Sequence, residues 1–311
     1  MYKKDIRLMA FVASAMFWGS GYAADNSIYI DQSGDNSTIT MTQDGSGNKI
    51  NGILLNGSAG ATIDPAKLIG NNQTVLIEQT GATNTLALGV NSTVVGGVGV
   101  NLTYKVDAGG NVGYININNN GIGTASNNAV SIIQSGGSAT TTLNMTGTGN
   151  QLTVGQSGGA NNKFIGTINA DSTIASISQT LGGGNETTLN MTGNKGQVTV
   201  TTQGATNITN ITQSAFGSAG AQAIVNINGS GNTTDITQTD GFDHYASVTV
   251  TGSSNNIDVI QNGGSNPGHS ATLLVNGSSN NIALTQQGSV SNLANIKVTG
   301  SSNNYTLLQK N

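Results

Sequence analysis

Apolar and polar residues alternate on both sides of a short turn sequence that recurs along the C-terminal half of the chain. Each copy reads apolar-x-apolar-x-Gly-x-x-Asn-x-apolar-x-apolar-x-Gln. A period of two is typical of strands that bury one face. The Gly-x-x-Asn between the two runs favours a turn, because glycine adopts positive φ and asparagine hydrogen-bonds to its own backbone. The pattern therefore predicts a strand–turn–strand unit.

Fixed positions in this unit define a predicted core. The turn glycines are Gly147, Gly229, Gly252, Gly277 and Gly300, and the last four recur at a nearly constant spacing, as in repeat proteins. The apolar core positions are Val248, Val250, Ile257, Val259, Leu273, Val275, Ile282, Leu284, Ile296, Val298 and Leu307. We expect these side chains to fill one interior shared by all the units.

Amide side chains occupy the same alternate positions as the apolar residues, so they point to the same face of the predicted strands. The pairs, each with the same internal spacing, are Asn150/Gln156, Asn207/Gln213, Asn232/Gln238, Asn255/Gln261, Asn280/Gln286 and Asn303/Gln309. A buried amide without a partner costs about 1–3 kcal/mol. We therefore expect equivalent amides on successive units to hydrogen-bond in ladders, as they do in cross-β structures.

A single unit is too small to be stable. Ordering about 23 residues costs on the order of 25–45 kcal/mol, whereas four or five buried side chains return about 1.5–3 kcal/mol each. Stacked units share strand pairs and core, so only the array is stable. The sequence predicts an all-β solenoid over residues 24–311, irregular over about 51–125, where the spacing changes.

Residues 1–23 read as a secretion signal. A basic start is followed by an apolar run over residues 8–18 and small residues at 21–23. The run is too short to cross a bilayer, which needs about 20 apolar residues. We expect a secreted chain without a membrane span. Removing Lys3, Lys4, Asp5 and Arg7 takes the net charge from −4 to −6 and leaves no arginine, which argues against nucleic-acid binding.

Little in the sequence indicates catalysis or metal binding. The chain has no cysteine, and its carboxylates are dispersed; Asp235, Asp240, Asp243 and Asp258 form the nearest group, which we expect to be solvated. His244 and His269, one repeat apart, could stack on neighbouring units and hold a metal, but exposed loop positions are the commoner case. We predict no enzyme, no cofactor and no metal site.

The series of motifs resembles the curlin repeat of bacterial curli amyloid fibres. Asn-x5-Gln occurs at the six pairs above, and Gln-x-Gly-x-x-Asn at residues 43–48, 79–84, 156–161 and 261–266. In the C-terminal units, apolar residues replace the glutamine of the first strand, at Ile227, Val250, Val275 and Val298. The resemblance covers most of residues 24–311 unevenly, and suits a divergent curlin-like or curlin-associated protein.

The resemblance implies a self-assembling subunit of a Gram-negative biofilm fibre, with a nucleator subunit and an outer-membrane secretion channel as further partners. The repeats begin at about residue 26 and reach residue 309. This favours an array without capping elements, whose open rungs add to another copy. The alternative is a secreted solenoid adhesin or surface-layer protein that binds glycans or surfaces without forming fibres.

Overall fold

The computed structural model is a β-solenoid whose rungs recur about every 23 residues, which confirms the predicted fold. It describes residues 27–33, 35–45, 48–51, 66–69, 72–81, 83–92, 100–107, 111–119, 128–136, 138–159, 161–182, 184–193, 196–204, 206–214, 221–229, 231–239, 244–252, 254–263, 268–277, 279–288, 292–300 and 302–310. The predicted signal, residues 1–23, lies outside this part. No helix in the described residues is long and apolar enough to cross a membrane.

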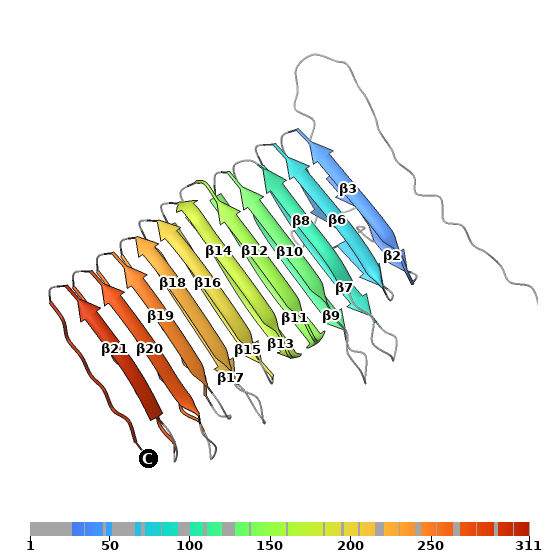
Figure 1. The fold of residues 1–311 in the computed structure, drawn as a ribbon. Helices are drawn as coiled ribbons and strands as arrows, with labels where there is room; N and C mark the ends of the chain where they lie inside the picture. The colour runs from blue at the N-terminus through green and yellow to red at the C-terminus, as the bar shows by residue number, and fades with distance from the viewer. Residues whose placement is uncertain are drawn as a thin grey trace, which may run out of the picture.

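Two parallel sheets face each other along the rod (Figure 1). Sheet 1 has ten strands: β1 (Ser27–Tyr29), β2 (Asp31–Ser33), β4 (Asn48–Asn51), β5 (Ala66–Ile69), β7 (Asn84–Ser92), β9 (Val112–Asn119), β11 (Ser138–Thr148), β13 (Asn161–Asp171), β15 (Gly184–Thr192) and β17 (Asn207–Ser214). Sheet 2 has eleven: β3 (Thr38–Asp44), β6 (Gln73–Thr80), β8 (Val100–Asp107), β10 (Ala129–Ser135), β12 (Gln151–Ser157), β14 (Ile174–Gly182), β16 (Gln197–Gly204), β18 (Gln222–Gly229), β19 (Tyr245–Thr251), β20 (His269–Asn276) and β21 (Asn292–Thr299).

Sheet 1 continues beyond β17 as four extended segments, residues 232–239, 255–263, 280–287 and 303–310. The Thr233 amide donates to the Asn207 carbonyl at 3.2 Å, and Ile282 forms parallel bridges with Ile257 and Tyr305. Thr237 and Gln238 have φ of 68° and 60°, a left-handed backbone that is incompatible with regular strand pairing. The segments therefore keep the stacking of sheet 1 while losing part of its hydrogen-bond ladder.

Strands alternate between the sheets along the chain, so each rung has two turns. We call the first edge the side where the chain passes from sheet 2 to sheet 1, and the second edge the side where it returns. Inward residues at every second position form one continuous core between the sheets. The core accommodates large side chains beside glycines of the same strand: a Cβ on Gly166 would lie 2.9 Å from Phe164 Cε1.

The range that we expected to be irregular, 51–125, contains regular rungs. Strands β6 to β9 pair in register with their neighbours on both sides, and β5 pairs with β7. The side chains of β6 and β8 alternate between buried and more exposed positions, as in the rest of the array. The described residues of this range therefore stay in the stack.

Candidate functional site: amide ladders and open ends

The predicted asparagine ladder exists and runs along sheet 1 at the first edge. Asn232 Nδ2 donates to Asn207 Oδ1 at 2.7 Å, and Asn255 Nδ2 donates to Asn232 Oδ1 at 2.5 Å. Asn280 and Asn303 extend the same series by donating to Asn255 and Asn280. The amides of Asn232, Asn255 and Asn280 also donate to the carbonyls of Gly229, Gly252 and Gly277, so each amide closes its own turn.

The predicted glutamine ladder also exists, at the second edge. Gln213, Gln238, Gln261 and Gln286 each donate from Nε2 to Oε1 of the next glutamine, at 2.8, 2.6, 2.7 and 2.9 Å, ending on Gln309. The first four side chains are buried. Each inner amide thus satisfies a neighbour one rung away, which is why the motif must be repeated.

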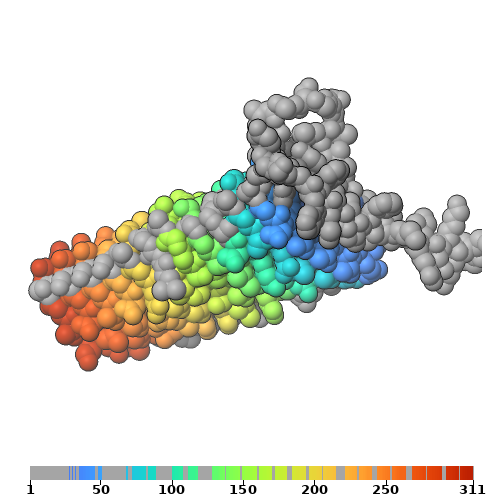
Figure 2. Space-filling view, turned by 90° about the horizontal axis from the view of Figure 1, so that it is seen from above, coloured from blue at the N-terminus to red at the C-terminus, as the bar shows by residue number. Residues whose placement is uncertain are grey.

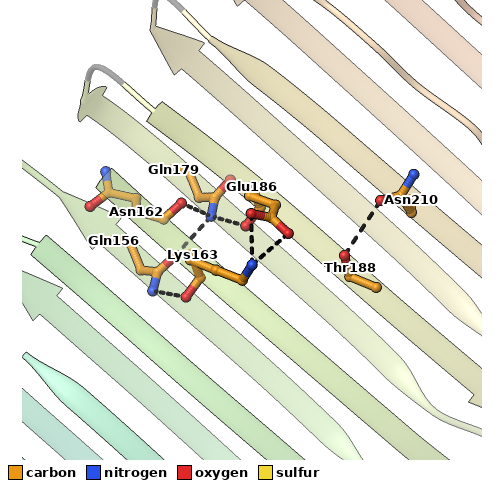
Figure 3. Close-up of polar contacts among 7 residues, drawn as sticks. All are labelled: Gln156, Asn162, Lys163, Gln179, Glu186, Thr188 and Asn210. Carbon is orange, nitrogen blue, oxygen red and sulfur yellow. Dashed lines mark hydrogen bonds and ion pairs between the residues drawn. The ribbon is translucent and has the colours of Figure 1, made fainter. Parts of the chain in front are cut away.

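Asn150 and Gln156 are buried ladder residues, as predicted, but their ladders are not those of the other five pairs. These two residues belong to sheet 2, whereas the other five pairs belong to sheet 1. Gln156 Nε2 donates to Gln134 Oε1 at 2.8 Å. Gln179 Nε2 donates to Gln156 Oε1, also at 2.8 Å (Figure 3). Gly147, which precedes Asn150, accordingly lies at the second edge rather than with the other turn glycines. Strand–turn–strand motifs fit either half of a rung, so the spacing alone did not separate them.

The N-terminal half therefore has its own glutamine ladder, at the first edge. Gln79 Nε2 donates to Gln43 Oε1 at 2.8 Å, and the series continues at Gln134, Gln156 and Gln179. The Gln-x-Gly-x-x-Asn motifs at 43–48 and 79–84 indicated this ladder in the sequence. Their asparagines stack in the same way as their glutamines, because Asn84 Nδ2 donates to Asn48 Oδ1 at 3.0 Å. At 156–161 the motif is displaced by one position: Asn161 is exposed, and Asn162 is the buried residue.

Tyr104 provides a ladder hydrogen bond at the one described rung of this series that lacks a glutamine. Val106 occupies the glutamine position of β8, between Gln79 and Gln134. The Tyr104 hydroxyl donates instead to Gln79 Oε1 at 3.0 Å. Burial raises the pKa of Tyr104 well above its usual range, so the hydroxyl stays a donor.

The ladder changes edge between β14 and β17. At the first edge, the column of Gln156 and Gln179 continues as Thr202, Ile227, Val250, Val275 and Val298. At the second edge, Met191 is followed by Gln213. Gly196 makes this possible, because a Cβ there would lie 2.4 Å from Gln213 Oε1. The apolar residues that replace the first-strand glutamine are thus matched by new glutamines on the opposite edge.

The turn glycines stack directly on one another at the first edge. A Cβ on Gly252 would lie 1.5 Å from the Gly229 carbonyl oxygen, and one on Gly300 would lie 1.6 Å from that of Gly277. Gly252 and Gly300 also have φ of 146° and 145°. Only glycine satisfies both the close approach of the rungs and this backbone conformation.

His244 and His269 stack on neighbouring rungs, with ring centroids 5.7 Å apart and planes inclined by 23°. Both are buried, so the exposed-loop interpretation was wrong. His269 Nε2 accepts a hydrogen bond from the Gly263 amide at 2.7 Å. Burial lowers the pKa of His269, and hydrogen bonds with Asn292 and Gln261 oppose this only in part. Among the described residues, no three His, Asp or Glu side chains gather as metal ligands do.

Asp235 lies on the outer face of sheet 1, half-buried, and accepts a hydrogen bond from Asn210. Its pKa is raised by burial, lowered by the Asn210 hydrogen bond and raised by the charge of Asp258. The other two members of the predicted acidic group, Asp240 and Asp243, lie outside the described residues.

Ion pairs also join neighbouring rungs on the outer faces. Lys105 Nζ lies 3.1 Å from Glu78 Oε1, and Lys163 Nζ lies 2.8 Å from Glu186 Oε1. All four side chains are partly exposed, so each pair contributes only about 0–1 kcal/mol. These charges connect neighbouring rungs.

The C-terminal rung leaves part of the core uncovered. Inward positions that are buried in every preceding rung of this region are half-buried at Ile296 and Val298, and exposed at Tyr305 and Leu307. Leu307, which we predicted to be core, is 52% exposed, because no described residue stacks on its outer side. The remaining predicted core residues, from Val248 to Leu284, are buried.

Fold and ladders together define a parallel β-solenoid with inward amide ladders and an exposed C-terminal rung. The chain matches no protein-family model, and no curated protein or solved structure is similar to it. The function must therefore be argued from the ladders and the ends.

Proposed function

We propose that this protein is a structural subunit of an extracellular, curli-like amyloid fibre, in which copies add end to end in a bacterial biofilm matrix. The observation that carries the proposal is the C-terminal rung, where the core and both ladders reach an exposed surface. The secretion signal predicted at residues 1–23 supports an extracellular location. A nucleator subunit and an outer-membrane secretion channel would be its further partners, by resemblance to curlin.

The backbone of residues 303–310 has unused pairing capacity. The amides of Thr306, Leu308 and Lys310 donate to the preceding rung, at 3.1, 3.3 and 3.3 Å. In a parallel strand, the N–H and C=O of alternate residues point to opposite neighbours. The groups of Tyr305, Leu307 and Gln309 therefore point away from the rod, and an unpaired strand of this kind is a template for another chain.

Side chains at the same end favour association. Tyr305 and Leu307 are 50% and 52% exposed. Burying such a side chain completely gains about 1.5–3 kcal/mol, so covering the remaining half returns about 1 kcal/mol each. Ladder amides add hydrogen bonds that are strongest in register. Both contributions require a partner with the same rung geometry, and another copy has it.

Electron microscopy of the purified chain without residues 1–23, incubated for days, tests the proposal. We expect unbranched filaments that bind an amyloid dye and diffract at about 4.7 Å along the axis. Stable monomers with affinity for glycans would contradict the fibre and favour the adhesin.

Two variants with equally exposed targets sharpen the test. Leu307→Lys places a charge on the open end, whereas Ile174→Lys places one on the outer face of β14, where Ile174 is 51% exposed. We expect Leu307→Lys to block elongation by leaving a buried charge at each junction, and Ile174→Lys to elongate normally. Equal elongation of the two would show that the open end does not carry the assembly.

A further inference from the structure

In the described part of the chain, both ends of the rod finish on the same half-rung, a layer of sheet 1. Among the described residues, sheet 1 comprises twelve layers: β1 with β2, β4 with β5, six further strands and four extended segments. Sheet 2 comprises eleven layers. The chain alternates between sheets, so the array both begins and ends with a layer of sheet 1. Figure 2 shows these ends at opposite tips of the rod.

We propose that successive copies in the fibre are related by a half-turn about the fibre axis, so that sheet 2 of one copy continues sheet 1 of the copy before it. This inference rests on the fibre function proposed above. After the last layer of sheet 1, the alternation requires a layer on the sheet 2 side. A rotated copy supplies it with its residues 27–33, and then places β3 on residues 303–310. An unrotated copy would put two layers of sheet 1 in succession and leave one layer of sheet 2 unfilled.

Most inward side chains at the ends match in this register; the exception is Gln32, which lies over Val298. Residues 303–310 lie over β3, so Tyr305 covers Ile39 and Leu307 covers Met41. Residues 27–33 lie over β21, so Ile28 covers Ala294 and Ile30 covers Ile296. Ile28, Ile30, Ile39, Ala294 and Ile296 are all partly buried and pack against the core of their own copy. The junction would thus complete the burial of apolar residues that each end leaves partly exposed.

The glutamine ladder becomes continuous under the same rotation. Gln309, which accepts from Gln286 at 2.9 Å, comes to lie over Gln43. Gln43 Oε1 accepts one hydrogen bond, from Gln79, and an amide oxygen has a second lone pair for Gln309 Nε2. The rotation exchanges the two edges, and this explains why the ladder changes edge between Gln179 and Gln213. A ladder confined to one edge would meet an apolar column in the next copy.

Charges at the two ends are also complementary. In this register Lys310 lies directly opposite Asp44, and both side chains are exposed. An exposed pair adds little to the strength of the junction. Opposite charges at the approaching ends nevertheless increase the association rate and help to select the orientation.

Cysteine pairs can test the rotation, because the chain has no cysteine of its own. Exposed Thr306 lies over exposed Thr40 across the rotated junction, and over Tyr29 across an unrotated one, where residues 27–33 would stack on residues 303–310. Neighbouring parallel strands are about 4.8 Å apart, within the span of a disulfide. We expect filaments of Thr40→Cys/Thr306→Cys to oxidise to covalent multimers, and those of Tyr29→Cys/Thr306→Cys to remain largely monomeric on a non-reducing gel.

Other outcomes identify which idea fails. Multimers from Tyr29→Cys/Thr306→Cys alone would overturn the rotation and keep the fibre. Dimers from the single variant Thr40→Cys would show head-to-head contacts and overturn the polarity as well. Absence of filaments from the cysteine-free chain would overturn the fibre function itself.

Seeded elongation provides a second measurement of the same junction. Lys310→Glu should slow elongation several-fold at low salt, because it places two like charges opposite each other, and adding Asp44→Lys should restore the rate. Lys105→Glu, on the outer face of β8, is the matched control. Failure of the double variant to recover would overturn the register that places Lys310 opposite Asp44.

Discussion

Replacing one glutamine in the middle of the ladder tests the stacking argument most directly. Gln238 accepts from Gln213 and donates to Gln261, and it is fully buried. Gln238→Leu keeps most of the volume but removes the ladder partner of both neighbours. Each orphaned amide group costs about 1–3 kcal/mol, so the free energy of unfolding should fall by about 2–6 kcal/mol. Urea denaturation of the monomer, followed by circular dichroism, measures this change.

Removing the whole ladder should lower the free energy of unfolding by less than the sum of four separate glutamine substitutions. When Gln213, Gln238, Gln261 and Gln286 are all replaced by Leu, almost no buried amide is left without a partner. The first edge shows that the fold accepts such a column, at Ile227, Val250 and Val275. We expect the quadruple variant to be no less stable than Gln238→Leu, because orphaned groups cost more than absent pairs.

Exposed Gln222 on β18 is the matched control for the glutamine substitutions. Gln222→Leu should change the free energy of unfolding by less than about 0.5 kcal/mol. Two results would refute the ladder argument. One is a Gln238→Leu variant as stable as Gln222→Leu, and the other is a quadruple variant whose loss is four times that of the single one.

Three further predictions follow from single contacts. Tyr104→Phe should lower the free energy of unfolding by about 1–3 kcal/mol, because it leaves Gln79 Oε1 without its donor, whereas Tyr114→Phe on the exposed face should have little effect in the same urea titration. Gly252→Ala should cost more than about 2 kcal/mol, through its clash with the Gly229 carbonyl and its positive φ, and a normal thermal midpoint would contradict this. Burial lowers the pKa of His269 in the folded state, so the unfolded chain binds protons more readily. The contribution of His269 to stability should be complete above about pH 6.5 and fall as the pH decreases. His269→Asn should weaken this dependence, which thermal melts at about pH 7.5 and pH 5 would measure.

Much of the fold was predictable because its information is local. The alternation of Val248 and Val250, then Ile257 and Val259, around Gly252 fixes which side chains are buried, and a single unit cannot bury them alone. The same parity placed Asn255 and Gln261 in the ladders. These conclusions needed only the period of the pattern and the cost of a buried amide.

The predictions from sequence were wrong where the position or burial of a residue depended on a neighbouring rung. Gln156 and Gln213 follow an asparagine at the same distance, yet they lie at opposite edges. Leu307 has the same sequence context as Leu284, but only Leu284 is covered on both sides. The two histidines looked like loop residues until the register aligned them.

The sequence by itself determined the period, the inward faces and the identity of the stacking residues, because these follow from alternation and turn chemistry within one repeat. Only the tertiary structure decided which half of a rung each motif occupies, where the glutamine ladder changes edge, and which ends of the core stay exposed. The physical reason is that a ladder contact joins residues a full rung apart. Its edge and its partner depend on the register in which the whole array stacks, and no single repeat contains that register.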